Sequence, residues 1–130
     1  MTRDLDTIVG AYVECALWSS HEYRDENQES PDDFDWADAD DIAPETMASF
    51  REDCAAMVAE AHGLEGSDWW TDEQFGHDFW LTRNGHGAGF WDRHYGDTAE
   101  ARAGDALSAM AKVYGECSLW TGDDGKVHAE

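Results

Sequence analysis

A chain of 130 residues with 30 Asp or Glu and 8 Lys or Arg carries a formal net charge of −22, which argues against direct binding to nucleic acid or anionic membranes. Seven tryptophans and a hydrophobic content of 42% exclude a disordered acidic tail. The length is typical of one folded domain, so we predict a single domain over residues 1–130.

The first half of the chain predicts two helices joined by an acidic connection. Apolar residues recur at three- and four-residue spacing over residues 4–19, which indicates a helix. Residues 25–43 follow as the connection, which Phe34, Trp36 and Ile42 are expected to attach to the body. The wider stretch 25–45 holds ten acids and no Lys or Arg, about twice an even share. Pro44 then opens a second helix, which ends at Gly63.

The second half predicts two hairpins and a third helix. Dense aromatic residues favour a strand over 75–83, a turn at 84–87 and a returning strand over 88–93, preceded by a short turn that Thr71 caps. A helix follows between Thr98 and Gly115, and residues 117–120 and 126–128 form a second hairpin. This order predicts an α+β domain in which about three helices pack on a small antiparallel sheet built from two hairpins.

Catalytic and metal chemistry have weak support in the pattern. His77 and Asp78 of the first predicted hairpin could form an acid–base pair beside Arg93, as in a small hydrolase, but ion pairs at a sheet edge explain the same residues. The histidines and cysteines lack the spacing of zinc ligands, and the acidic connection lacks the ligand order of an EF-hand. We therefore expect neither an enzyme nor a cofactor or metal.

The cysteines and tryptophans bear on compartment and association. Cys15, Cys54 and Cys117 lie far apart, with no paired motif and no secretory signal, which predicts a cytoplasmic protein with reduced, buried thiols. Trp80 and Trp91 are expected in the core. Four other tryptophans near segment ends could pack in the core, anchor a partner or serve a homodimer: Trp18, Trp36, Trp69 and Trp70.

Two segments resemble known sequences. The run at residues 76–93, GHDFWLTRNGHGAGFWDR, and the tail GDDGKV at residues 122–127 resemble segments of small bacteriophage-encoded proteins of unknown function. The resemblance covers roughly residues 70–128, and it implies a viral origin and an accessory role without an established activity. The acidic stretch 25–45 is not part of the shared pattern, so we expect it to carry a function of this member alone.

The charge predicts the partner. A folded protein with dense carboxylates can compete for the Lys and Arg arrays that grip DNA, and by charge this chain is similar to phage DNA-mimic inhibitors. We expect it to inhibit a host DNA-binding protein with a basic cleft, as an anti-restriction, anti-CRISPR, repair-blocking or nucleoid-binding factor. A salt-adapted protein or a protein-binding accessory module without mimicry is the alternative. The predicted partner-binding residues are Asp25, Glu26, Glu29, Asp32, Asp33, Asp35, Trp36, Asp38, Asp40, Asp41, Glu45 and Glu52.

Overall fold

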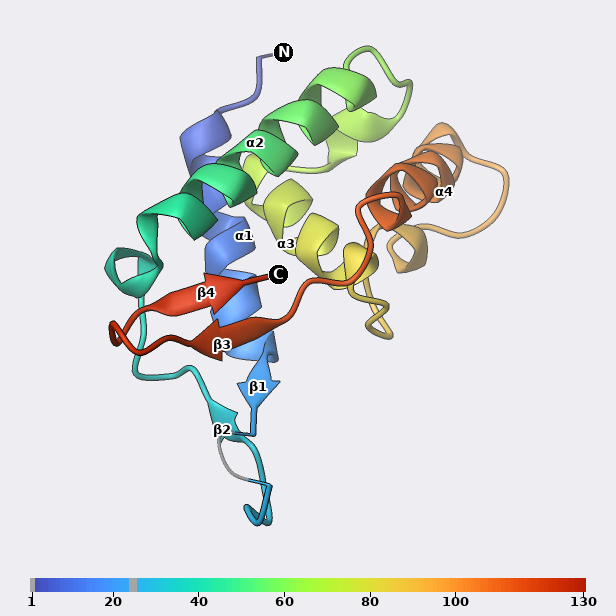
Figure 1. Ribbon diagram of the computed structural model, residues 1–130. Helices are drawn as coiled ribbons and strands as arrows, with labels where there is room; N and C mark the ends of the chain where they lie inside the picture. The colour runs from blue at the N-terminus through green and yellow to red at the C-terminus, as the bar shows by residue number, and fades with distance from the viewer. Residues whose placement is uncertain (1, 24–25) are drawn as a thin grey trace.

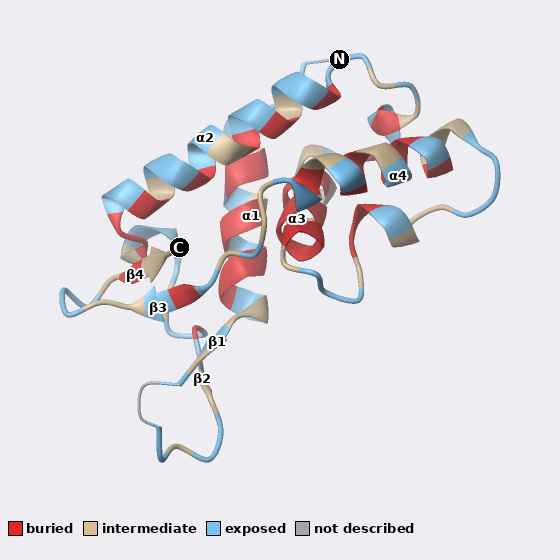
Figure 2. Cartoon of the chain, turned by 45° about the vertical axis from the view of Figure 1, so that its right-hand side comes forward, coloured by how far each residue is buried: buried red, intermediate tan, exposed pale blue. Residues whose placement is uncertain are grey.

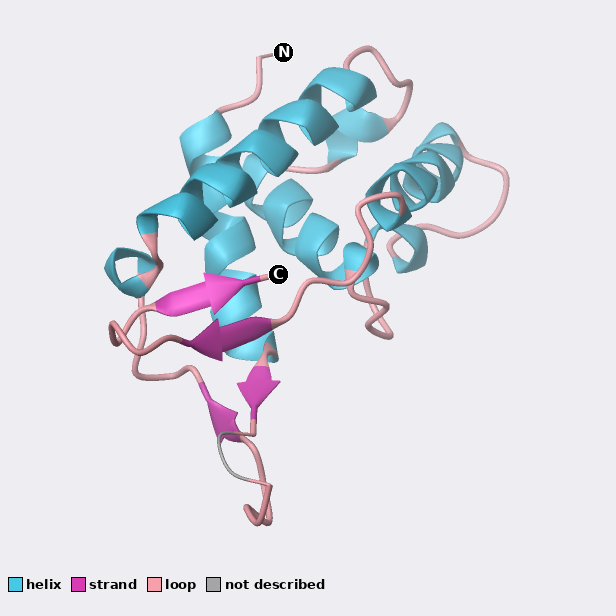
Figure 3. Ribbon diagram, in the orientation of Figure 1, coloured by secondary structure: helices cyan, strands magenta, loops and turns pink. Residues whose placement is uncertain are grey.

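Four helices dominate the part of the chain that the computed structural model describes, residues 2–23 and 26–130 (Figure 1). They are α1 (Leu5–Ser19), α2 (Pro44–Ala61), α3 (Asp72–Arg83) and α4 (Ala99–Lys112). Two antiparallel pairs of short strands lie together at one edge, as Figure 3 shows. The first pair is β1 (His21–Glu22) with β2 (Asp32–Asp33), and the second is β3 (Leu119–Thr121) with β4 (Val127–Ala129).

The core is centred on the crossing of α1 with α3, where both helices are largely buried (Figure 2). The backbones approach closely because position 76 is glycine, and a Cβ there would lie 2.2 Å from the carbonyl oxygen of Ile8. Tyr12 of α1 packs edge-on or tilted against three aromatic rings, with centroid distances of 5.1–5.2 Å. Those rings belong to Phe50, Phe79 and Trp80, so one tyrosine joins α1, α2 and α3.

The predicted hairpin at residues 75–93 is wrong, because its first half is helix α3. The Thr71 hydroxyl accepts a hydrogen bond from the Gln74 amide, so the cap opens a full helix rather than a short turn. α3 is buried on more than one face, and its aromatic density serves a central helix. The predicted return strand instead contains the 3-10 turn η3 (Phe90–Asp92), which the Phe90 amide ties to the Thr82 hydroxyl.

The α+β class is therefore confirmed with a different content. The described chain has four helices rather than about three, and its strands form two separate two-stranded sheets rather than one. The helices predicted from residue 4, Pro44 and Thr98 are present, and so is the C-terminal hairpin. The first sheet was not predicted. Its strand β2 lies within the acidic connection and pairs with β1, which lies just before that segment.

The aromatic residues divide differently from the prediction. In the acidic connection Phe34 and Ile42 are buried as expected, whereas Trp36 is exposed and does not attach this segment to the body. Trp91 is also exposed rather than in the core. Trp70, by contrast, is completely buried, and its indole donates a hydrogen bond to Asp78. Packing against α3 and η3 thus selects Trp70 over Trp91 for the interior.

Candidate functional site

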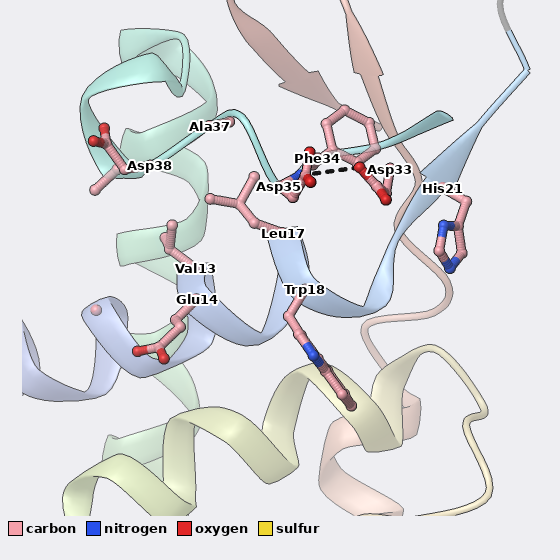
Figure 4. Close-up of a pocket in the computed structure, with 12 residues that line it drawn as sticks. Val13, Glu14, Leu17, Trp18, His21, Asp33, Phe34, Asp35, Ala37 and Asp38 are labelled. Carbon is pink, nitrogen blue, oxygen red and sulfur yellow. Dashed lines mark hydrogen bonds between the residues drawn. The ribbon is translucent and has the colours of Figure 1, made fainter. Parts of the chain in front are cut away.

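A groove of about 590 Å³ separates α1 from the chain that follows β2 (Figure 4). Its floor is apolar, and Figure 4 shows Val13, Leu17 and Phe34 between the two backbone segments. Carboxylates stand along its edge, so we call it the acid-rimmed groove. The acidic residues of its lining are Glu14, Asp33, Asp35 and Asp38.

Local structure on both sides builds this groove. On α1, Gly10, Glu14 and Trp18 recur every four residues and form an exposed stripe beside the buried face. On the other side, the β1–β2 pairing turns the chain back past the end of α1, and Phe34 is then completely buried. The acidic connection is therefore a wall of the groove rather than a free tether.

Hydrogen bonds from backbone amides to aspartate carboxylates hold the far end of this wall. The short 3-10 helix η1 (Ala39–Asp41) is closed by a capping box, in which the Asp38 carboxylate accepts from the Asp40 amide at 2.9 Å. The Asp41 carboxylate accepts from the Asp38 amide at 2.9 Å in return. Asp38 and Asp41 thus have a structural role in addition to their charge.

The rim carboxylates lack cationic neighbours. The Asp35 amide donates to the Asp33 carboxylate at 3.4 Å, which places the two acids together. The hydrogen bond that the two carboxyl groups share and the repulsion between them raise the pKa of Asp35 above that of an ordinary Asp. Among the residues that the structure describes, no Lys, Arg or His forms an ion pair with Asp33, Asp35, Asp38 or Glu14. A cationic ligand would relieve this repulsion.

Several arginines instead bind groups in the interior of the protein, and the clearest case is the contact of Arg93 with Asp78. This carboxylate is completely buried in α3 and accepts two hydrogen bonds from the Arg93 guanidinium, at 3.0 and 2.6 Å. It also accepts from the Trp70 indole at 2.9 Å and from the Gln74 amide group at 2.8 Å. Four donors therefore surround one carboxylate, and the hydrogen bonds between Arg93 and Asp78 raise the pKa of Arg93.

Two further arginines are held in the same way. Arg83 is buried and donates to the Tyr12 hydroxyl, to Asp53 and to the carbonyl oxygens of residues 114 and 115, which ties the end of α4 to α3. Arg3 donates to the carbonyl oxygens of Ser67 and Trp70 and lies over the Phe75 ring. Because these cations are used within the body, the outer surface is left with mostly negative charge.

The structure brings together only part of the predicted partner-binding set. Asp33, Asp35 and Asp38 line the groove, whereas Asp25 lies outside the described residues. Other predicted residues belong to the same segment but do not line the groove: Glu26, Glu29, Asp32, Trp36, Asp40 and Asp41. Glu45 and Glu52 stand on α2, where Glu45 lies 3.6 Å from His128 of β4.

The α1 side of the groove was missed. Gly10 and Glu14 were not among the predicted partner-binding residues, and Trp18 was expected only as one of four tryptophans that could anchor a partner. Trp18 is 75% exposed, more than any other tryptophan of the described chain. An exposed aromatic ring beside a carboxylate rim can stack on a guanidinium or an ammonium group.

The residues of the hydrolase-like alternative do not form a hairpin site. Asp78 cannot act as a base, because both of its oxygens already accept hydrogen bonds. His77 lies on α3 beside a second hollow, of about 600 Å³, and its Nδ1 is 3.7 Å from Asp78. Burial raises the pKa of both the Cys15 and the Cys54 thiol to about 12, which leaves them unreactive.

In the described chain no group of three or more His, Cys, Asp or Glu side chains is arranged to hold a metal ion. Within residues 2–23 and 26–130, no helix has both the length and the apolar character needed to cross a membrane. No protein family, curated protein or solved structure matches this chain.

Proposed function

We propose that this protein binds a host DNA-binding protein through its acidic connection and acts there as a DNA mimic that inhibits the partner. The observation that supports this most strongly is the unequal use of charge. Three arginines are consumed by buried or half-buried contacts inside the body, while the carboxylates around the groove have no cationic partner among the described residues. A basic cleft that normally holds phosphates is the natural complement.

The proposal keeps the accessory, phage-type role that the resemblance implies, with action in the cytoplasm of the host. Fast electrostatic steering toward the cleft follows from the net charge of −22, and affinity falls as salt screens the two surfaces. The alternative of a salt-adapted surface requires only an even coat of acids. The groove favours binding over that alternative, because an apolar floor beside unpaired carboxylates adds nothing to solubility.

The decisive experiment is displacement of DNA. Proteins that this chain captures from host lysate are released and loaded with a fluorescent DNA duplex. The chain is then titrated in, and the fluorescence anisotropy of the duplex is recorded. We expect the duplex to be released, and capture to be lost in excess duplex or at roughly 0.5 M salt, where the screening length is below about 5 Å. Capture that resists both DNA and salt contradicts mimicry.

A charge-matched pair of variants locates the contact. The triple variant Asp33→Asn, Asp35→Asn, Asp40→Asn removes three charges from the acidic connection and leaves the capping residues intact. We expect the variant to need at least about tenfold higher concentration to displace the duplex, because the removed charges face the basic cleft.

The control removes three charges from exposed positions outside the groove, by Glu60→Gln, Glu65→Gln and Asp105→Asn. It should retain most of the activity. Equal losses in the two triple variants would mean that only net charge matters, as expected for a protein with an even acidic coat.

A further inference from the structure

The acid-rimmed groove does not end at α1. The second hollow, of about 600 Å³, lies between α1 and the first turns of α3, and Gly10 and Glu14 line both hollows. The two therefore meet over the exposed stripe of α1, with Gly10 between them. Each is within the size range of pockets that bind ligands.

Gly10 is unexplained by the packing of the protein itself. It lies inside α1 with ordinary helical backbone, and a Cβ built there would have nothing within 4 Å. Gly76 differs, since its Cβ would meet the Ile8 carbonyl oxygen at 2.2 Å. Glycine is a poor helix former, so the helix itself gains nothing from Gly10. What Gly10 does is expose bare backbone at the point where the two hollows meet. Such a position permits another backbone to approach closely.

The two hollows differ in what they would hold. Val13, Leu17 and Ala37 offer an apolar floor for a large aliphatic or aromatic side chain, and the carboxylates stand beside it. Glu14 lines both hollows, and the second is bordered by Glu73, His77 and Arg93, whose charge is paired with Asp78. A ligand that used the whole surface would carry an apolar group flanked by positive charges. A second copy of this chain is a poor candidate, because two molecules of charge −22 repel each other.

We infer that a basic amphipathic segment of a partner protein crosses α1 at Gly10, places an apolar side chain over Val13 and Leu17, and sets Lys or Arg against Glu14 and the Asp33–Asp35 pair. The segment's backbone uses the space that the absent Cβ leaves. Trp18, which is exposed and belongs to the lining of the groove, offers a ring on which one of these cations can stack. This inference rests on the proposed function and names the part of the basic partner that is bound.

Three synthetic peptides of equal length test the chemistry. The first alternates Lys with Leu, the second alternates Lys with Ser at the same charge, and the third alternates Glu with Leu. Binding of each labelled peptide is measured by fluorescence anisotropy at about 0.15 M salt. We expect the Lys–Leu peptide to bind roughly tenfold more tightly than the Lys–Ser peptide, because one apolar side chain is buried, and the Glu–Leu peptide not to bind. Equal affinity for both cationic peptides would overturn the inference.

The variant Gly10→Gln tests whether the peptide crosses α1 at Gly10. The long neutral side chain fills the crossing without altering charge, and we expect the Lys–Leu peptide to bind at least about tenfold more weakly. Ala56→Gln is the matched control, since it adds the same side chain to an exposed position of α2 outside both hollows. Circular dichroism should show that Gly10→Gln melts no lower than the original protein. Unchanged peptide binding by Gly10→Gln overturns the assignment.

The same variants separate this inference from mimicry. If the Lys–Leu peptide binds at Gly10 but no captured protein releases its duplex, mimicry fails and the groove assignment stands. If duplex displacement is intact in Gly10→Gln, mimicry stands and the crossing segment is ruled out. Sedimentation of the free protein adds one more outcome, because self-association that Gly10→Gln abolishes would identify a second copy as the occupant and overturn the partner assignment.

Discussion

Aspartates in the helical body and aspartates in the acidic connection have opposite environments. Asp78 is completely buried, and four donors from three side chains surround it. Asp33 and Asp35 are exposed, and their two carboxyl groups interact with each other. The same residue type thus stabilises the fold in one region and is left available to a ligand in the other. This contrast predicts that substitutions should separate stability from binding.

The largest effect is expected at Asp78. Asp78→Asn removes the charge but keeps the shape, and it leaves the half-buried Arg93 guanidinium with only the more distant Asp92 carboxylate, at 3.8 Å, as a counter-ion. Breaking a buried pair from one side costs about 3–5 kcal/mol of unfolding free energy. Urea unfolding should show this loss, whereas Asp40→Asn at the exposed connection should change the unfolding free energy by less than about 0.5 kcal/mol. Similar values for the two variants would remove the contrast.

Two helical glycines give the next effect, with opposite signs. Gly76→Ala places a methyl group against the backbone of α1, and we expect it to cost about 1–3 kcal/mol or more by forcing α1 and α3 apart. Gly10→Ala meets nothing within 4 Å and should stabilise the protein by about 0.5–1 kcal/mol, as an exposed helical glycine does. Thermal unfolding of the two variants checks both signs. Destabilisation by Gly10→Ala would show that the fold itself needs this glycine.

Much of the fold could be predicted because its outer helices are amphipathic. The apolar stripe of α1, the proline that opens α2 and the Thr98 cap of α4 are all local signals, and each led to a helix that is present. α3 escaped prediction because α1, α4 and η3 surround it and bury polar residues such as Asp78 and Arg83. A helix without a polar stripe has no helical periodicity, so its aromatic density favours a strand.

The candidate site could be predicted only on its acidic side. The density of carboxylates in residues 25–45 is visible in the sequence, but the wall they form depends on the pairing of β1 with β2, which is not a local signal. Without that pairing, nothing indicates that Asp33 and Asp35 line the same groove as Glu14. Arg93 was expected beside Asp78, but through a hairpin; the two residues meet instead because η3 carries Arg93 back to the side of α3.

The smallest effect concerns pH at the acidic connection. The neighbouring Asp33 carboxyl raises the pKa of Asp35, so Asp35 takes up a proton at a higher pH in the folded protein than in the unfolded chain. This contribution favours the folded state at acid pH and is lost as pH rises through the raised pKa. For a cationic ligand the sign is reversed, because protonated Asp35 no longer attracts it. Affinity for the Lys–Leu peptide should therefore decline as pH falls through that pKa, while Asp35→Asn shows a flatter profile. Identical pH profiles for the two proteins would mean that Asp35 does not face the bound cation.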